Sequence, residues 1–399
     1  MTNYYNMNSK FISLCLGLSF FITGRAQEEG YMFTNIVNQK ATPVKNQAAT
    51  GTCWCFATTS FIESELLRKG KGEYDLSEMF IVRKKYMNQL EDNYLRHGKG
   101  NINQGSLSHT WKNAFKEVGI VPEEIYQGIQ YNSDRHNHSE MVQYIMCIAN
   151  KAIDMKKRSP EYYKIIDNIF DTYLGKVPEK FEYKGKEYTP MTFAKSLDIN
   201  LDDYVELTSF THKPFYSKFS IEVPDNWENQ EMYNIPLNEF MQTMDYALNN
   251  GYTICWDGDV SEKGFSFKNG VAINPEVNNV NYLNDTDRAR FEKMNESEKL
   301  EEVYKFKKPY SEIDVTPETR QQGYESFVTT DDHLMHITGI SKDQNGTKYY
   351  VTKNSWGTER NKFGGYLNMS ENYVKAKTIY IMIHKDAIPK DIKKKLSIE

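Results

Sequence analysis

The sequence divides into a first part with helical patterns and a last part with strand patterns, and this division limits the folds open to the chain. Apolar residues recur at helical spacing over residues 53–69. Residues 76–80 open a second helix, for which Ser77 is the expected N-cap. A third helical pattern follows Gly105 and stops at Gly119. The first part of the chain is therefore predicted to form a mainly helical lobe.

Strand patterns are concentrated in the later part of the chain. They occupy residues 252–256, 334–340, 348–353 and 378–383. The dipeptide Asp257-Gly258 is a typical turn signal between two of these runs. Together, the two parts predict an α+β protein with one helical lobe and one lobe rich in strands.

A polar, tyrosine-rich block lies between the two lobes. Within it, residues 162–173 have a helical pattern, and residues 189–201 fit a helix or a loop. The weak periodicity of the block favours an insertion over a separate domain. We therefore expect an N-terminal segment and helical lobe at 27–135, an insertion at 136–235, and a β-rich lobe with a C-terminal tail at 236–399.

The N-terminal 26 residues have the pattern of a secretory signal peptide. Lys10 precedes an apolar run at residues 11–23, and Gly24-Arg25-Ala26 places small residues where a signal peptidase reads them. The run is too short for a membrane span, and we find no other stretch of that length. We expect an exported protein, periplasmic or secreted, that is cleaved after Ala26 and has no membrane-spanning helix.

Composition and cysteine count exclude several classes of protein. Hydrophobic residues make up 39% of the chain and charged residues 26%, as in soluble globular proteins. The net charge is −5 and the sequence has no basic stripe, so we expect no nucleic-acid partner. Of the five cysteines, Cys15 lies in the apolar run, where the bulky Leu14 before it argues against lipid attachment. The other cysteines have no partner at metal-ligand spacing, so we expect no metal and no other cofactor.

Cys53 begins the first predicted helix and follows a loop that contains Gln47. A cysteine in the first turn of a helix lies at the positive end of the helix dipole, so we expect its pKa to be lowered and its thiolate to be available for attack. Gln47 lies six residues upstream, where its side-chain amide and the Cys53 N–H could donate to a developing oxyanion. On its own, this segment is better explained by an inert buried thiol and an ordinary loop glutamine.

A second segment, far along the chain, supplies a histidine and an asparagine. His333 starts one predicted strand, and Asn354 follows the next strand, after a turn. A hairpin of these strands would bring the two side chains together, and the Asn354 amide oxygen could accept the ring N–H that faces away from a sulfur. Trp356 could shield that bond from water. His336 is the competing histidine, but it lies on the opposite face of the strand, so we prefer His333.

These motifs resemble those of the papain superfamily of cysteine peptidases. That family has a glutamine six residues before Cys-Trp, then a histidine after an acidic residue, then Asn-Ser-Trp-Gly, in the order found here. The resemblance implies a papain-like fold and a catalytic site of Cys53, His333, Asn354 and Gln47. Thr50 stands where many members have a disulfide cysteine, so that bridge is expected to be absent.

Within the superfamily, the chain resembles the bleomycin hydrolase and aminopeptidase C branch. The segment 256–260, the long chain between Cys53 and His333, and the lack of room for a long propeptide between Ala26 and Cys53 carry this resemblance. It implies peptide substrates, aminopeptidase action and a homo-oligomer, a hexamer in many relatives. Members of the branch can place their C-terminus in the cleft. The lysine-rich tail at 390–399 is expected to be a solvated charged end instead, so exopeptidase and endopeptidase action both remain open.

Three residues are candidates for binding substrate. Gly105 resembles the family glycine whose backbone pairs with an extended substrate, although it also fits an ordinary loop glycine. Trp356, in the segment that carries Asn354, is the second candidate. Asp257, with Asp259, could hold a free amine of a substrate, but we interpret both aspartates as shaping a turn.

The leading interpretation is hydrolysis of peptide bonds through a thioester acyl-enzyme. One alternative is a non-catalytic peptide-binding protein on a degraded peptidase fold. The presence of the cysteine, the histidine and the glutamine together argues against it. The other alternative is an amide hydrolase or acyltransferase that uses the same triad on a substrate other than a peptide.

Overall fold

The structure is a computed structural model that describes residues 30–280 and 283–399. The predicted signal peptide, residues 1–26, lies outside the described residues. The helices are α1 (Cys53–Arg68), α2 (Glu78–Leu95), α3 (Ser108–Val118), α4 (Ser139–Asp154), α5 (Pro160–Leu174), α6 (Pro190–Ser196), α7 (Leu237–Asn249), α8 (Asp285–Phe291), α9 (Glu296–Val303), α10 (Pro317–Glu325), α11 (Glu371–Lys377) and α12 (Lys390–Lys395). The strands are β1 (Thr34–Asn38), β2 (Phe181–Tyr183), β3 (Lys186–Tyr188), β4 (Tyr204–Thr208), β5 (Lys218–Ser220), β6 (Glu231–Asn234), β7 (Ile254–Gly258), β8 (Phe265–Ser266), β9 (Val271–Ala272), β10 (His333–Lys342), β11 (Lys348–Lys353), β12 (Tyr366–Ser370) and β13 (Thr378–His384).

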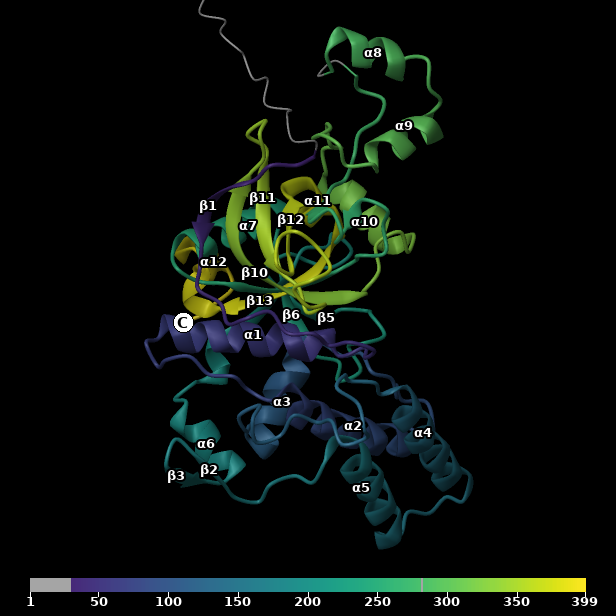
Figure 1. Cartoon of the computed structure of the whole chain (residues 1–399), viewed down its shortest axis with the longest axis vertical. Helices are drawn as coiled ribbons and strands as arrows, with labels where there is room; N and C mark the ends of the chain where they lie inside the picture. Colours follow the sequence, from purple (N-terminus) through teal and green to yellow (C-terminus); the bar gives the residue numbers. More distant parts are fainter. Residues whose placement is uncertain (1–29, 281–282) are drawn as a thin grey trace, which may run out of the picture.

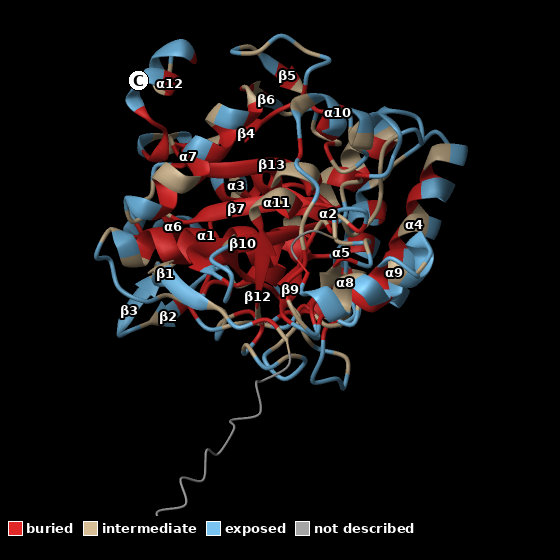
Figure 2. Cartoon of the chain, turned by 90° about the horizontal axis from the view of Figure 1, so that it is seen from above, coloured by how far each residue is buried: buried red, intermediate tan, exposed pale blue. Residues whose placement is uncertain are grey.

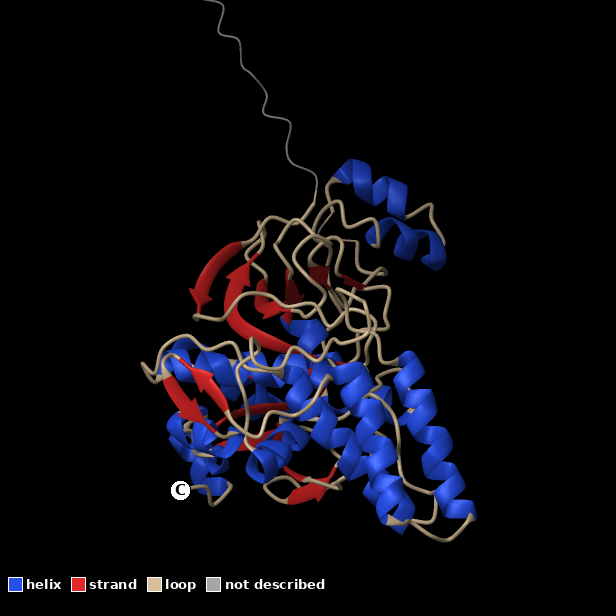
Figure 3. Ribbon diagram, turned by 60° about the horizontal axis from the view of Figure 1, so that its bottom comes forward, coloured by secondary structure: helices blue, strands red, loops and turns tan. Residues whose placement is uncertain are grey.

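The chain forms a β-rich lobe and a helical lobe, with α1 between them (Figure 1). Helices α2 to α6 gather on the side of α1 that faces away from strands β10 to β12, as a second view also shows (Figure 3). The main sheet runs in the order β5-β6-β4-β13-β7-β10-β11-β12-β9-β8, and β1 pairs with β10. The predicted α+β architecture in two lobes is confirmed.

Helix ends in the helical lobe are set by local residues. The Ser77 side chain accepts a hydrogen bond from the Phe80 N–H at 3.1 Å, which makes it the N-cap of α2. Gly119 ends α3 with φ +76°, a conformation that glycine adopts at no steric cost. The predictions for the starts and ends of these helices are therefore confirmed.

The strands that carry the site lie in the middle of the sheet. Strand β10 pairs antiparallel with β7 on one side and with β11 on the other, and the residues from His333 to Ser341 are all buried. The central strands β7, β10 and β13 form the buried interior of the molecule in Figure 2. Because neighbours on both sides hold β10, its first residue has a fixed place.

The apolar core has two large parts, one on each side of β10. One part contains Trp54, Phe61 and Trp111 of the helical lobe and also takes in Leu334 of β10. The other contains Met335 of β10 and lies within the β-rich lobe. Side chains that alternate along one strand therefore contribute to both parts, which joins the two lobes.

The segment 136–235 contributes to both lobes. It contains α4, α5, α6 and the small β2–β3 hairpin, which belong to the helical lobe. It also contains β4, β5 and β6, and β4 pairs with β13 in the main sheet. The expected helix at 162–173 is α5, and residues 189–201 hold the short helix α6.

The C-terminal tail packs on the β-rich lobe. Ile392 of α12 and Leu396 are buried in the core part that contains Met335. The tail was expected to be a solvated charged end, and this expectation is wrong for the side that carries these two apolar residues. The tail follows His384, whose ring lies 5.5 Å from the ring of Tyr252, and Tyr252 lies under Arg68 at the C-terminal end of α1. Because a helix rises about 1.5 Å per residue, that end of α1 is on the order of 20 Å from Cys53.

The sequence predicts neither the family disulfide at Thr50 nor a membrane-spanning helix. Among the described residues, Cys53, Cys55, Cys147 and Cys255 are free thiols. No helix in the part of the chain that the structure describes is long and apolar enough to cross a membrane.

Candidate active site

Cys53 is the first residue of α1, and its backbone N–H therefore has no acceptor within the helix. The loop before it is tied to the loop that carries Gly105, because Gly51 N donates to the Gln104 side chain at 2.8 Å and the Trp54 indole donates to Gln104 O at 3.0 Å. The Cys53 side chain is only 8% exposed. The backbone N–H of Leu334 favours the ionised form of the thiol, so the sulfur lies near the start of β10.

His333 is the first residue of β10, and Asn354 directly follows β11. The His333 Nε2 atom lies 2.8 Å from Asn354 Oδ1, and the Ser355 N–H donates to the same oxygen at 2.7 Å. Because an amide oxygen can only accept, the His333 Nε2 atom carries the hydrogen of this bond. The ring nitrogen Nδ1 is then an acceptor, as a base for the Cys53 thiol requires.

Trp356 covers the histidine. The two ring centroids lie 4.9 Å apart, and Phe265 and Phe267 pack against Trp356 with edge contacts at 6.0 and 5.1 Å. This aromatic group limits the access of water to the bond between His333 and Asn354, as its sequence position had suggested.

Gln47 lies beside this pair and is held by Ser355. The Ser355 hydroxyl donates to Gln47 Oε1 at 2.6 Å, and Gln47 Nε2 donates one hydrogen to Thr50 O at 2.8 Å. An amide nitrogen has two hydrogens, so one remains for another acceptor. The role of Ser355 as a link between Gln47 and Asn354 was not predicted, because only the neighbouring Asn354 and Trp356 had an assigned chemistry.

His336 has a different environment. Its Nδ1 atom lies 2.9 Å from the Ser60 hydroxyl in the middle of α1, and its ring packs against Phe61 at 6.1 Å. The structure therefore joins His333, Asn354 and Gln47 through hydrogen bonds and places Cys53 near Leu334, the residue after His333, whereas His336 contacts the middle of α1.

The expectation of a lowered pKa for Cys53 is wrong for the free protein. Burial raises the pKa of this thiol to about 12, and the nearby carboxylates of Asp257, Asp225 and Asp331 add to the effect, although the Leu334 N–H works against it. Burial likewise lowers the pKa of His333 to about 4, opposed by the bond to Asn354. The neutral thiol and neutral imidazole are thus favoured at rest. Proton transfer from sulfur to ring would place two opposite charges in one buried site, where each offsets the desolvation of the other.

Asp257 does not shape a turn, contrary to our interpretation. It lies within β7, opposite Leu334 of β10 and Tyr380 of β13, and it is completely buried. The strand continues through this residue because neighbours pair with it on both sides. Asp259 does hold the following turn, since its carboxylate accepts hydrogen bonds from the N–H and hydroxyl of Ser261, both at 2.8 Å.

Gly105 lies against Asp225. A Cβ atom at this position would come within 1.9 Å of Asp225 Oδ2, so any larger residue would require the Asp225 side chain to move. The Asn103 side chain fixes the same carboxylate through a bond of 2.7 Å to Oδ1. A substrate strand that paired with Gly105 would therefore lie beside a carboxylate.

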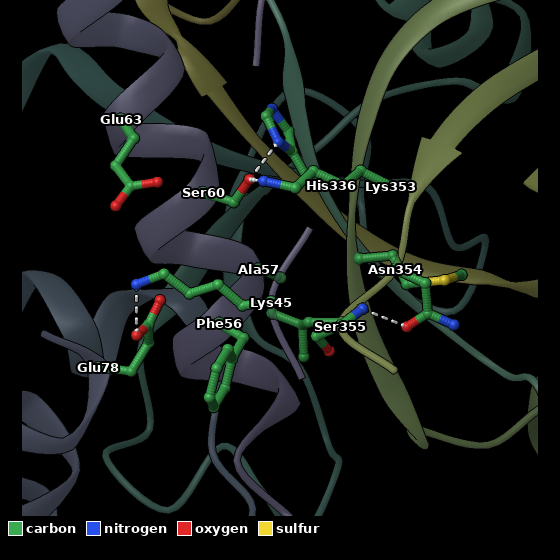
Figure 4. Close-up of a pocket in the computed structure, with 12 residues that line it drawn as sticks. Lys45, Phe56, Ala57, Ser60, Glu63, Glu78, His336, Lys353, Asn354 and Ser355 are labelled. Atoms are coloured by element: carbon green, nitrogen blue, oxygen red, sulfur yellow. Dashed lines mark hydrogen bonds and ion pairs between the residues drawn. The ribbon is translucent and has the colours of Figure 1, made fainter. Parts of the chain in front are cut away.

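A buried polar cluster lies behind these residues and joins the segments that carry them (Figure 4). Lys45, two residues before Gln47, binds Glu78 at 2.9 Å, and Lys353, next to Asn354, donates to the Ser60 hydroxyl at 2.7 Å. Together with Glu63 these side chains line a cavity of about 20 Å³. The cluster links the Gln47 loop and the end of β11 to α1 and α2.

Comparison with known proteins agrees with this geometry. Residues 34–174 match the family described as papain family cysteine protease, and residues 301–399 match the peptidase C1-like family. The solved structure of PepW from Lactobacillus rhamnosis has a TM-score of 0.65 and 17% identity, with 91% of this chain and 84% of that one covered, so the two share a fold.

Curated relatives match over most of their length. Aminopeptidase G of Lactobacillus delbrueckii subsp. lactis is 23% identical over 395 residues, which cover 89% of this chain and 83% of that protein. Aminopeptidase C of Lactococcus lactis subsp. lactis is 22% identical over 396 residues, with 88% and 82% covered. The chain belongs to the papain superfamily of cysteine peptidases. Within that superfamily it is similar to the aminopeptidases C and G.

Proposed function

We propose that the protein hydrolyses peptide bonds with Cys53 as nucleophile. The sulfur attacks the carbonyl carbon as its proton moves to His333, and His333 then passes this proton to the leaving amine. The thioester that remains is attacked by water, whose proton again goes to His333, and the carboxylic acid product leaves as the thiol is restored. The proposal is carried by the bond of 2.8 Å between His333 Nε2 and Asn354 Oδ1, with the Cys53 sulfur near Leu334, the residue that follows His333.

The oxyanion of each tetrahedral intermediate is proposed to lie between two donors. One is the Cys53 N–H, which has no helical acceptor, and the other is the second hydrogen of Gln47 Nε2. Both are fixed before the reaction, since α1 holds the first and Ser355 and Thr50 hold the second. Donors that need no rearrangement stabilise the developing charge most effectively.

Aminopeptidase action is the proposed specificity. Its support is the similarity to aminopeptidases C and G over more than 80% of their length. Incubation with a mixed peptide library, followed by mass spectrometry of the products, tests this specificity. Stepwise loss of residues from the N-terminus is the expected result, whereas scattered internal cuts would identify an endopeptidase.

Replacing Gln47 by glutamate should lower kcat by about 10² to 10³. Glutamate keeps the oxygen that accepts from the Ser355 hydroxyl at 2.6 Å, but it loses both N–H groups and adds a negative charge beside the oxyanion. The effect should appear in kcat measured with fluorogenic peptides. Because the buried glutamate also loses the bond to Thr50 O, the thermal unfolding midpoint should fall, and kcat is measured at a temperature where the variant is folded. A kcat within threefold of that of the unmodified protein would remove Gln47 from the oxyanion site.

We also propose that the protein is exported and that it forms a homo-oligomer. The signal-peptide pattern of residues 1–26 supports export with cleavage after Ala26, which N-terminal sequencing of the mature protein would test. The similarity to the aminopeptidase C branch supports a homo-oligomer, for which light scattering in solution gives the number of subunits.

A further inference from the structure

Three aspartates from separate segments lie around the proposed nucleophile. They are Asp225 in the loop between β5 and β6, Asp257 in β7, and Asp331 just before β10. Each of them raises the pKa of Cys53 through its charge, after the larger effect of burial, so all three are close to the sulfur. Three carboxylates near a group that must become an anion oppose catalysis, so their presence calls for a role in binding.

Two of these carboxyl groups face each other without a donor from the protein. Asp257 is 0% exposed, and neither of its oxygens receives a hydrogen bond from an N–H or hydroxyl of the described residues; the same holds for Asp331 Oδ2. Burial and the neighbouring charge of Asp331 raise the pKa of Asp257, and burial together with Asp225 raises the pKa of Asp331 to about 7, so we expect the pair to hold a proton near neutral pH. Each buried carboxylate that lacks a donor is a strong acceptor for a cation.

The cations near this pair are already engaged. Lys377 binds Asp259 at 3.4 Å, contacts Glu262 and donates to Val328 O at 2.8 Å. The Lys85 ammonium group donates a hydrogen bond to Asn103 O at 2.6 Å, and burial lowers the pKa of Lys85 to about 7. Within the described ranges, no lysine or arginine forms an ion pair with Asp225, Asp257 or Asp331.

Asp331 also opens onto a cavity of about 470 Å³. Apolar side chains that include Val223, Tyr324 and Phe327 line it, and Phe327 is 83% exposed at its rim. The loop that ends in Asp331 is fixed, since Thr330 N donates to Asp259 and its hydroxyl to Asp332 at 2.8 Å. The lining also includes Glu325 and Glu222, and Glu222 pairs with His212 at 3.1 Å. A cavity that combines apolar side chains with the carboxylate of Asp331 fits an ammonium group attached to an apolar residue.

Asp225 directly follows Val223 and Pro224, two residues that line this cavity. Its loop is docked on the Gly105 segment by bonds from Asn103 to Asp225 at 2.7 Å, from Asn101 to Pro224 O at 2.9 Å and from Trp227 to Ser106 at 2.9 Å. The C-terminal tail, by contrast, packs near the far end of α1 and brings no carboxylate to the cleft in this structure.

The geometry points to Asp331 and Asp257, with Asp225, as the site that binds an ammonium group of the substrate on the Gly105 side of the scissile bond. This inference rests on the proposed peptidase function and gives its substrate class: peptides with a free α-ammonium group at the cleaved end. Three N–H donors of an ammonium can satisfy the oxygens that lack donors, and the proton shared by the two acids is released to solvent as the cation binds. A lysine side chain in a longer peptide has the same chemistry, and the experiment separates the two sources.

Three substrates with one fluorogenic leaving group test the inference: leucine with a free α-amine, N-acetyl-leucine, and N-acetyl-lysyl-leucine. We expect the unmodified protein to favour free leucine over N-acetyl-leucine by at least 100-fold in kcat/KM. Asp331→Asn and Asp257→Asn should each lower this preference at least tenfold, mainly through a higher KM for free leucine. Hydrolysis of N-acetyl-leucine should not fall, because the loss of a carboxylate near Cys53 favours its thiolate. Both changes replace a carboxyl group by an amide of equal size, and thermal unfolding verifies the fold. Asp314→Asn, at an exposed position, is the control for loss of one charge.

Binding measured without turnover separates this inference from the proposed function. Calorimetry on the Cys53→Ala protein compares leucinamide with N-acetyl-leucinamide, and Asp331→Asn in the same background should weaken leucinamide binding at least tenfold. Equal binding of the two amides overturns the inference even if the enzyme is active. Preference for leucinamide in a protein that cleaves nothing supports the site while rejecting the peptidase function. Loss of cleavage of N-acetyl-lysyl-leucine alone in Asp331→Asn assigns the site to a side-chain ammonium and overturns the α-ammonium assignment.

Discussion

Replacement of Cys53 by alanine is expected to lower kcat/KM for peptide hydrolysis by about 10⁴-fold or more, because the variant has no atom that can form the thioester. The fold should tolerate the change. Alanine is smaller and suits a helix start, and the change removes only one buried sulfur atom. Hydrolysis of short fluorogenic peptides measures the loss, and the thermal unfolding midpoint verifies that the protein is intact.

A second cysteine variant serves as the control that distinguishes the nucleophile from other free thiols. Cys147 is exposed on α4, so Cys147→Ser should keep full activity while removing the most accessible free thiol among the described residues. Alkylation by the inhibitor E-64 should modify Cys53 in the unmodified protein and in Cys147→Ser, and should modify nothing in Cys53→Ala. Undiminished turnover by Cys53→Ala would rule out the mechanism proposed here.

The parts of the fold that the sequence predicted correctly are those with strong local signals. Helix α1 has helical spacing over its whole length, and Ser77 and Gly119 mark helix ends by capping and by positive φ. Strands β10 and β11 are long apolar runs around a clear turn. Such signals depend on neighbouring residues only, so no tertiary structure is needed to interpret them.

Short polar strands could not be predicted in this way. Strands β5 and β6 have three and four residues with exposed polar positions, and they become strands because β4 recruits β6 onto the sheet. The misinterpretation of Asp257 has the same origin. Asp-Gly normally indicates a turn, but pairing of β7 with both β10 and β13 keeps this dipeptide extended.

Sequence motifs predicted which residues form the site, but not the direction in which the pKa of Cys53 is shifted. Motif spacing identified Cys53, His333, Asn354 and Gln47, because each segment carries its own pattern. The raised pKa of Cys53 depends on burial and on Asp225 and Asp331, which are far from it in sequence. A helix dipole can be inferred from sequence, whereas the carboxylates opposing it become visible only when the chain is folded.

The polar cluster behind the site is expected to govern stability. Lys45 bonds Glu78 at 2.9 Å and Leu76 O at 3.0 Å, and it lies near Glu63. Although burial works against its charge, these acids raise the pKa of Lys45 above its ordinary value. For Glu63, burial raises the pKa to about 7, and the charge of Lys45 limits the rise. The lysine therefore limits the rise that burial causes in the pKa values of these acids.

Replacing Lys45 by methionine should lower the free energy of unfolding at pH 8 by about 3 kcal/mol, because buried carboxylates lose their cation while the apolar volume is kept. Without Lys45 the pKa of Glu63 rises further, so the folded variant holds protons that the unfolded chain has lost above its ordinary pKa. The destabilisation should therefore be smallest near pH 5 and grow as pH rises through 7. Urea unfolding at both pH values measures it. Lys116→Met, which removes an exposed ion pair with Asp202, should lose less than about 1 kcal/mol at either pH. Equal losses for the two variants would show that Lys45 does not support the buried acids.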